Sequence, residues 1–136
     1  MKYLVDANVL SEPTRPDPDP QVIAWLRENE RALSVDPIIL GEIRYGIPLL
    51  RAGRRRTALE NWFDDGVVRL RCISWEAETG LRWAALVARL RSKGQAMRIK
   101  DSLIAAAALE HGLVVVTRNR ADFVRTGVEV LDPFAA

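Results

Sequence analysis

The segment Asp101–Asn119, with the sequence DSLIAAAALEHGLVVVTRN, decides the fold of this chain. Its first part, Asp101–His111, is rich in alanine, which favours a helix, and Gly112 is a typical helix stop. Leu113–Val116 then supplies four consecutive apolar residues, three of them β-branched, which predicts a buried strand. A helix that leads directly into a buried strand indicates an α/β protein.

The same alternation continues on both sides of this segment. Further strands are expected at Tyr3–Val5, Ala32–Val35, Val67–Ile73 and Glu129–Leu131. Helices are expected at Pro20–Glu30, from Asp36-Pro37 to about Ala52, at Arg54–Asp65 and at Trp75–Lys93, with one turn at Phe123–Arg125. Asp19-Pro20 and Asp36-Pro37 are typical helix starts. We therefore predict one domain over residues 1–136, with a mostly parallel central sheet and helices on both faces.

Composition and length fit a soluble globular domain. The chain has 136 residues, 49% of them hydrophobic and 28% charged, which is enough to bury a sizeable core. Three apolar residues before Asp6 are too few for a signal peptide, and no segment approaches the roughly 18 apolar residues of a membrane span. The single cysteine, Cys72, forms no internal disulfide, so we expect a reducing, cytoplasmic compartment and a place for Cys72 in the core.

The net charge of +2 is mild, but the basic residues cluster. They gather at Arg54–Arg56, Arg89–Lys100 and Arg118–Arg125. Such clusters usually form solvated faces and indicate binding only where they flank a site. The four tryptophans, which could stack on nucleic-acid bases, lie on or beside apolar helix faces, which favours core or dimer packing.

Carboxylates follow the predicted strands at the places where a parallel sheet binds ligands, outside the carboxyl ends of its strands. Asp6 and Asn8 follow the first predicted strand directly. Thr117–Asn119 and Asp122 follow the predicted strand Leu113–Val116. Asp101 begins the helix that leads into that strand. These side chains are the first candidates for a site.

Glu42 is the one acidic residue of an otherwise apolar helical stretch, where Ile39, Ile43 and Ile47 recur at helical spacing. A charge near a buried face is costly unless it is paired or binds a metal ion. Gly46, one turn further on, leaves room beside it. Periodicity alone equally allows Glu42 to lie at the edge of the apolar stripe and face solvent.

Each of the other candidates also has a structural interpretation. Asp6 could form an Asx-turn with the backbone at Asn8. Asp101 could be a helix N-cap, and Asp122 could cap a short turn. His111, the single histidine, suits the carboxyl end of a helix dipole, which favours a structural role over a catalytic one.

Three or four converging carboxylates, without a cysteine or histidine cluster, favour a hard divalent cation such as Mg²⁺ or Mn²⁺ and exclude a zinc site. Such an ion activates water and stabilises the charge of a phosphoryl transition state. The absence of a Gly-rich phosphate loop argues against P-loop nucleotide hydrolysis. An alternative is a phosphate-accepting domain with Asp6 as nucleophile, although Asn8 stands where a second Asp would favour it.

Four stretches then stand in a recognisable order. They are Tyr3–Pro13 (YLVDANVLSEP), Ile39–Gly46 (ILGEIRYG), Asp101–Ala106 (DSLIAA) and Val116–Phe123 (VTRNRADF). Together they resemble the motifs of the PIN-domain ribonucleases, in particular the VapC-type toxins of bacterial toxin–antitoxin pairs, with the FitB-like subgroup most similar. The resemblance covers essentially the whole chain, and so implies a single PIN-like domain.

The resemblance also implies a function. The chain would be a metal-dependent endoribonuclease that acts as a toxin, with RNA as substrate, a cognate antitoxin, a homodimer and an assembly with the antitoxin on operator DNA. Asp6, Glu42 and Asp101 would hold Mg²⁺, or Mn²⁺, with Asp122 as a further catalytic residue. Supporting roles are expected for Asn8, Thr117 and Asn119. Contacts with the RNA backbone are expected for Arg98, Lys100, Arg118 and Arg120.

Two positions depart from the family pattern. Ala7 stands where many members carry threonine, and Asn119 stands where some carry aspartate. The fourth acid then falls to Asp122, or the site works with three. Two alternatives follow: a PIN-fold protein that is not a toxin, and a non-catalytic partner in an antitoxin–DNA complex. No motif encodes the RNA target.

Overall fold

The computed structural model describes residues 2–135, which form a five-stranded, all-parallel sheet. The strands are β1 (Tyr3–Val5), β2 (Leu33–Val35), β3 (Arg71–Cys72), β4 (Val114–Val116) and β5 (Val130–Leu131). Their order across the sheet is β3-β2-β1-β4-β5. The predicted α/β class with a parallel sheet is confirmed.

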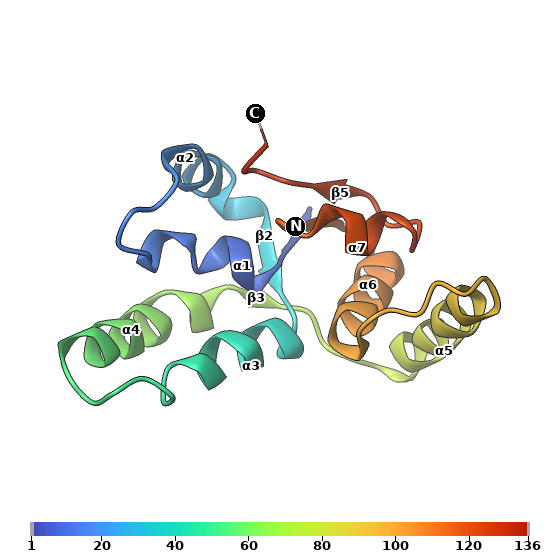
Figure 1. Cartoon of the computed structure of the whole chain (residues 1–136), viewed down its shortest axis with the longest axis horizontal. Helices are drawn as coiled ribbons and strands as arrows, with labels where there is room; N and C mark the ends of the chain where they lie inside the picture. Colours follow the sequence, from blue (N-terminus) through green and yellow to red (C-terminus); the bar gives the residue numbers. More distant parts are fainter. Residues whose placement is uncertain (1, 136) are drawn as a thin grey trace.

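Helices cover both sides of this sheet. They are α1 (Ala7–Leu10), α2 (Pro20–Glu28), α3 (Pro37–Gly46), α4 (Arg54–Asp65), α5 (Ala77–Ser92), α6 (Ile99–His111) and α7 (Arg120–Val124), with 3₁₀ turns at Glu12–Thr14, Glu30–Ala32 and Val67–Arg69. Figure 1 shows α1, α2 and α4 on one side of the sheet and α5, α6 and α7 on the other. Within residues 2–135, none of these helices has the length and apolar character needed to cross a membrane.

The Asp-Pro pairs begin two of these helices as predicted. The carboxylate Oδ1 of Asp19 accepts a hydrogen bond from the Gln21 amide at 2.9 Å, and Oδ1 of Asp36 accepts one from the Ile39 amide at 2.8 Å. The proline that follows each Asp fixes a helical φ without wasting a donor. Gly112 ends α6 with a φ of +64°, a left-handed conformation that glycine adopts without steric cost.

The core lies around the two central strands. Leu4 and Val5 of β1 and Val115 and Val116 of β4 are wholly buried. Ala105–Ala108 of α6 are buried on every side, since α6 packs between the sheet and α5. Small side chains allow α6 to approach both the sheet and α5 closely, and this explains the run of alanines in Asp101–Asn119.

The edge of the sheet differs from the prediction. The stretch Val67–Ile73 was expected to be one strand, but only Arg71–Cys72 pair, and a 3₁₀ turn precedes them. Because β3 lies at the edge of the sheet, Cys72 is exposed. The prediction that Cys72 lies in the core is wrong. The helix that begins at Asp36 also stops earlier, at Gly46, since Pro48 cannot continue it.

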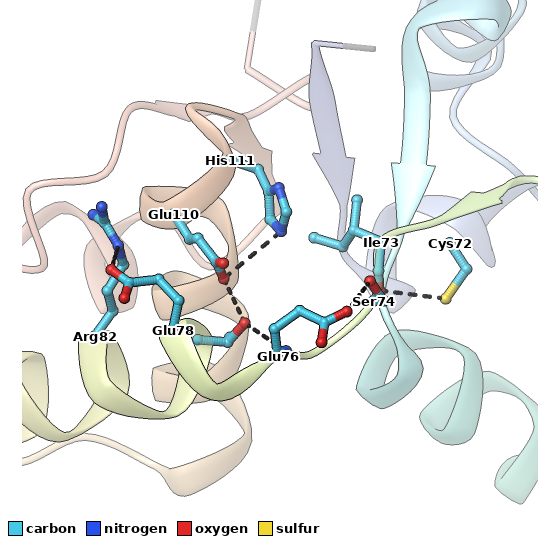
Figure 2. Close-up of polar contacts among 9 residues, drawn as sticks. Cys72, Ile73, Ser74, Glu76, Glu78, Arg82, Glu110 and His111 are labelled. Carbon is cyan, nitrogen blue, oxygen red and sulfur yellow. Dashed lines mark hydrogen bonds and ion pairs between the residues drawn. The ribbon is translucent and has the colours of Figure 1, made fainter.

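A polar cluster joins α5 to α6 at the end of the molecule that carries His111 (Figure 2). The Thr79 hydroxyl donates to the Glu110 carboxylate and accepts a hydrogen bond from the Glu76 amide at 3.0 Å. His111 Nε2 lies 3.7 Å from Glu110 Oε1. His111 lies at the end of α6 beside this cluster, as its position in the sequence predicts.

Candidate active site

The strand order places the switch point of the sheet between β1 and β4. On one side of β1 lie β2 and β3, and on the far side of β4 lies β5, so the chain winds in opposite directions from this point. Ligands of open parallel sheets bind at such a switch point, outside the carboxyl ends of the strands. Asp6 and Thr117 are the first residues after β1 and β4, and the Asp6 amide donates to the Val116 carbonyl at 2.8 Å.

Asp6 is the most buried of the four candidate acids, with 5% of its surface exposed. Its Oδ1 accepts a hydrogen bond from the Ala7 amide at 2.8 Å, which caps α1, and its Oδ2 accepts one from the Thr117 hydroxyl at 2.8 Å. Burial raises the pKa of Asp6, the two hydrogen bonds oppose that rise, and the charges of Glu42 and Asp101 add to it. The predicted Asx-turn with the Asn8 backbone is not formed among the described residues, since Asp6 accepts from the Ala7 amide and from the Asn8 side chain.

The three predicted supporting residues form one network around Asp6. Asn8 Nδ2 donates to Asp6 Oδ2 and to Thr117 Oγ1, both at 3.3 Å. The Asn119 amide donates to Thr117 Oγ1 at 3.1 Å. The Arg118 amide donates to Asn8 Oδ1 at 3.1 Å, which ties the loop after β4 to α1. This network fixes the orientation of the Asp6 carboxylate.

Glu42 comes from α3, the helix that follows β2. Its side chain is 28% exposed. Glu42 is therefore neither buried within the apolar stripe of α3 nor fully exposed to solvent. Its Oε2 lies 3.4 Å from Nζ of Lys100, which is the second residue of α6. The pair links the helix that carries Glu42 to the helix that carries Asp101.

Asp101 and Asp122 complete the group from α6 and α7. Asp101 is the third residue of α6 and Arg98 is the N-cap, so the interpretation of Asp101 as the N-cap is wrong. Desolvation raises the pKa of Asp101, as do the charges of Asp122 and Glu42, whereas Arg98 and Lys100 lower it. Asp122 is exposed in the first turn of α7.

The structure thus brings four acids from four separate elements to one end of the sheet, near enough for their charges to act on one another. Within residues 2–135, no group of three or more acidic, cysteine or histidine side chains lies close enough together to hold a metal ion. Carboxylates that repel one another need not meet without a cation between them. The donor set consists of carboxylate oxygens alone, partly desolvated, and this chemistry fits a hard divalent ion.

The predicted basic residues divide into two groups. Arg98 and Lys100 act on Asp101, as its pKa shows. The Arg118 guanidinium lies 4.4 Å from the centre of the Phe134 ring, and Arg120 Nη1 donates to the Val130 carbonyl at 3.4 Å. These two side chains contact the C-terminal segment, and the structure does not bring them to the acids.

Asp36 is an acid near this site that sequence patterns identified only as a helix cap. It is wholly buried, and its pKa is raised to about 6, first by burial and then by the charge of Asp6. Its hydrogen bonds from the first turn of α3 lower the pKa, as does the Trp75 indole. The distance and angle between Asp36 Oδ2 and Trp75 Nε1 nonetheless do not make a full hydrogen bond. Both atoms are buried, and neither has a hydrogen-bond partner among the described residues. No sequence signal distinguishes a buried cap from an exposed one.

Residues 3–129 match the PIN domain. The chain belongs to the PIN-domain family. This PIN domain is 30% identical over 135 residues to Toxin FitB of Neisseria gonorrhoeae, covering 96% of this chain and 97% of that protein. It is also 30% identical over 135 residues to VapC ribonuclease Y4jK of Sinorhizobium fredii, covering 96% of each. Plasmid stability protein StbB of Pseudomonas syringae is 32% identical over 137 residues, with 98% and 99% covered.

Solved structures give the same family. This PIN domain matches a chain of the FitAcB crystal structure from Neisseria gonorrhoeae with a TM-score of 0.92 and 29% identity, covering 98% of this chain and 99% of that one. The structure of FitAB bound to an IR36 DNA fragment gives a TM-score of 0.92 and 28% identity, with 98% and 96% covered. The resemblance to VapC- and FitB-type proteins, inferred from four motifs, is confirmed.

Proposed function

We propose that this chain is a metal-dependent endoribonuclease that acts as the toxin of a toxin–antitoxin pair. The observation that carries the proposal is the placement of Asp6, Glu42, Asp101 and Asp122 at one end of the sheet. Burial raises the pKa of Asp6 and of Asp101, the charge of Glu42 adds to both rises, and the charge of Asp122 adds to that of Asp101. Two relatives, a VapC ribonuclease and a FitB toxin, support the reaction and the role.

In this proposal Asp6, Glu42 and Asp101 hold Mg²⁺, or Mn²⁺. The ion, when bound, activates a water for attack on the phosphodiester and neutralises the charge that develops on the phosphate. Thr117 and the Ala7 amide keep the Asp6 carboxylate in one orientation, and Asp122 would orient water beside Asp101. Arg98 and Lys100 supply positive charge next to Asp101, where the phosphate of the substrate would lie.

The direct test is cleavage of single-stranded RNA by the purified protein with Mg²⁺, with Mn²⁺ and with a chelator. Asp6→Asn and Asp101→Asn should each abolish cleavage, and Asp64→Asn, an exposed acid of α4, is the matched control that should keep it. Circular dichroism checks that Asp6→Asn still folds, since Asp6 also caps α1. Full activity in both site variants would overturn the mechanism, and a trapped phosphate on Asp6 would favour the phosphate-accepting alternative.

The proposal includes a cognate antitoxin, because two similar chains come from structures entitled FitAcB and FitAB, the latter bound to DNA. Induced expression of this chain in a bacterium should arrest growth, and coexpression of a small DNA-binding protein from a neighbouring reading frame should restore it. Growth arrest that persists in Asp101→Asn would contradict a catalytic toxin. Undisturbed growth with an active nuclease would favour a PIN protein that is not a toxin.

A homodimer is also part of the proposal. Large apolar side chains remain exposed on α3, just beyond it and at the start of α6, namely Tyr45 at 69%, Leu49 at 67% and Ile99 at 67%. Exposed apolar side chains of this size favour association. Sedimentation equilibrium should show a dimer that Tyr45→Lys with Ile99→Lys converts to a monomer, and a monomeric wild-type chain would refute this part.

A further inference from the structure

A pocket of about 420 Å³ lies beside the acids and takes in side chains that the proposed mechanism does not use. Its lining residues are Ala96, Met97, Arg98, Asp101, Asp122 and Arg125. The volume falls in the lower part of the range of small-ligand pockets, roughly 300–1,000 Å³. Two carboxylates of the candidate site form one wall, and two arginines with the apolar Met97 form the rest. The pocket is thus a continuation of the site toward the linker before α6.

Arg125, the residue that follows α7, is the distinctive feature of this pocket. Its Nη2 donates to the Ala96 carbonyl at 3.2 Å, so the side chain bridges α7 to the linker before α6. Its Nε is buried and has no acceptor within residues 2–135. A guanidinium carries five donors, and a buried donor without an acceptor is costly, so hydrogen bonding at Arg125 is incomplete.

The charge of Arg125 is also uncompensated at close range. Among the described residues no carboxylate lies within ion-pair distance of Arg125, although Asp101 and Asp122 line the same pocket. Arg98 has no such partner either, though it is close enough to lower the pKa of Asp101. The two guanidinium groups are therefore able to take an anionic ligand next to the acids.

We propose that this pocket binds the phosphodiester next to the scissile one, with Arg125 and Arg98 as phosphate contacts and Met97 against the sugar or base. The inference rests on the proposed ribonuclease function and deepens it. A strand whose scissile phosphate lies at Asp101 must carry its neighbouring phosphate along an adjoining wall, and this pocket shares Asp101 and Asp122 with the site. Arginine is suited to this contact because its planar donors match phosphate oxygens.

The test uses a short RNA that the wild-type protein cleaves at one mapped bond. Single methylphosphonate groups, which remove the charge of one phosphate, are placed at each position flanking that bond. In the wild-type protein, one adjacent position should lower kcat/KM by on the order of tenfold, as loss of a charged hydrogen bond does. In Arg125→Gln the same substitution should have little further effect, because the contact is already absent.

Binding provides a readout that does not require cleavage. In an Asp6→Asn background, fluorescence anisotropy measures the affinity for the same RNA over a series of salt concentrations. Arg125→Gln should reduce the slope of log K against log salt by about 0.7, the change for one phosphate contact on a single strand. Arg89→Gln is the matched control, since Arg89 donates to the Thr126 carbonyl at 2.9 Å but lies outside the pocket.

The outcomes separate this inference from the proposed function. If the wild-type protein cleaves no RNA, the proposed function fails and the inference fails with it. If the protein cleaves RNA but no methylphosphonate position depends on Arg125, only the inference fails. Equal effects of Arg125→Gln and Arg89→Gln on the salt slope would also overturn it, because they would assign Arg125 a purely structural role.

Discussion

Replacing Asp36 with asparagine should change how stability depends on pH. Asp36 is wholly buried, and its pKa in the folded protein is about 6 against an ordinary value of 3.8. The folded state therefore binds this proton more tightly than the unfolded state. Stability is lost as the pH rises from about 4 to about 6, and the loss is complete above that window. At about 1.4 kcal/mol for each pKa unit, the difference corresponds to about 3 kcal/mol.

Asparagine removes this charge and keeps an oxygen that can accept from the Ile39 amide. Urea unfolding of both proteins between pH 4 and pH 8 should show the variant gaining on the wild type by up to about 3 kcal/mol as the pH rises. The other titrating groups are present in both proteins, so the difference reports the charge of Asp36 together with its coupling to Asp6. Asp36→Ser, an uncharged cap, should give the same trend. A difference that is constant, or that shrinks with rising pH, would refute the reasoning.

Three other perturbations test the site and the core. Thr117→Val removes the hydroxyl that donates to Asp6 Oδ2 at 2.8 Å, and it should lower kcat/KM for RNA by about tenfold. Thr117→Ser keeps a hydroxyl and should restore kcat/KM, whereas unchanged kinetics in Thr117→Val would contradict the role of the network. Ile104→Ala removes a fully buried side chain of α6 and should cost about 2–5 kcal/mol in urea unfolding, and a smaller loss would mean the core collapses around it. Arg82→Ala breaks an exposed pair with Glu78 at 3.0 Å, and the same assay should show a loss below about 0.5 kcal/mol.

Sequence patterns predict an element correctly where the interactions that form it are local. The Asp-Pro pairs predict the starts of α2 and α3 because both the side-chain cap and the proline act within one turn. The run Leu113–Val116 predicts β4 because a central strand is buried on both faces and needs apolar residues throughout. These elements carry or flank the site, so the end of the sheet where it lies was predictable.

Long-range packing decides what the sequence could not show. Cys72 looked like a core residue because its neighbours are strand-like, but the strand order makes β3 an edge. Arg118 and Arg120 border the site in sequence, yet Phe134 and the Val130 carbonyl draw them to the C-terminal segment. Neither outcome follows from spacing along the chain, because both depend on which distant segment is packed alongside.

The candidate acids differ in how their charge is compensated, and this difference indicates which of them a bound cation would stabilise most. Glu42 has Lys100 at 3.4 Å, and the charges of Arg98 and Lys100 partly offset the desolvation of Asp101. Asp6 is the most buried of the four and is held only by neutral donors, while two acids act against its charge. A cation placed among them would relieve Asp6 most, because hydrogen bonds orient a carboxylate without neutralising it. The acid that a bound cation would stabilise most therefore lies at the switch point, between β1 and β4.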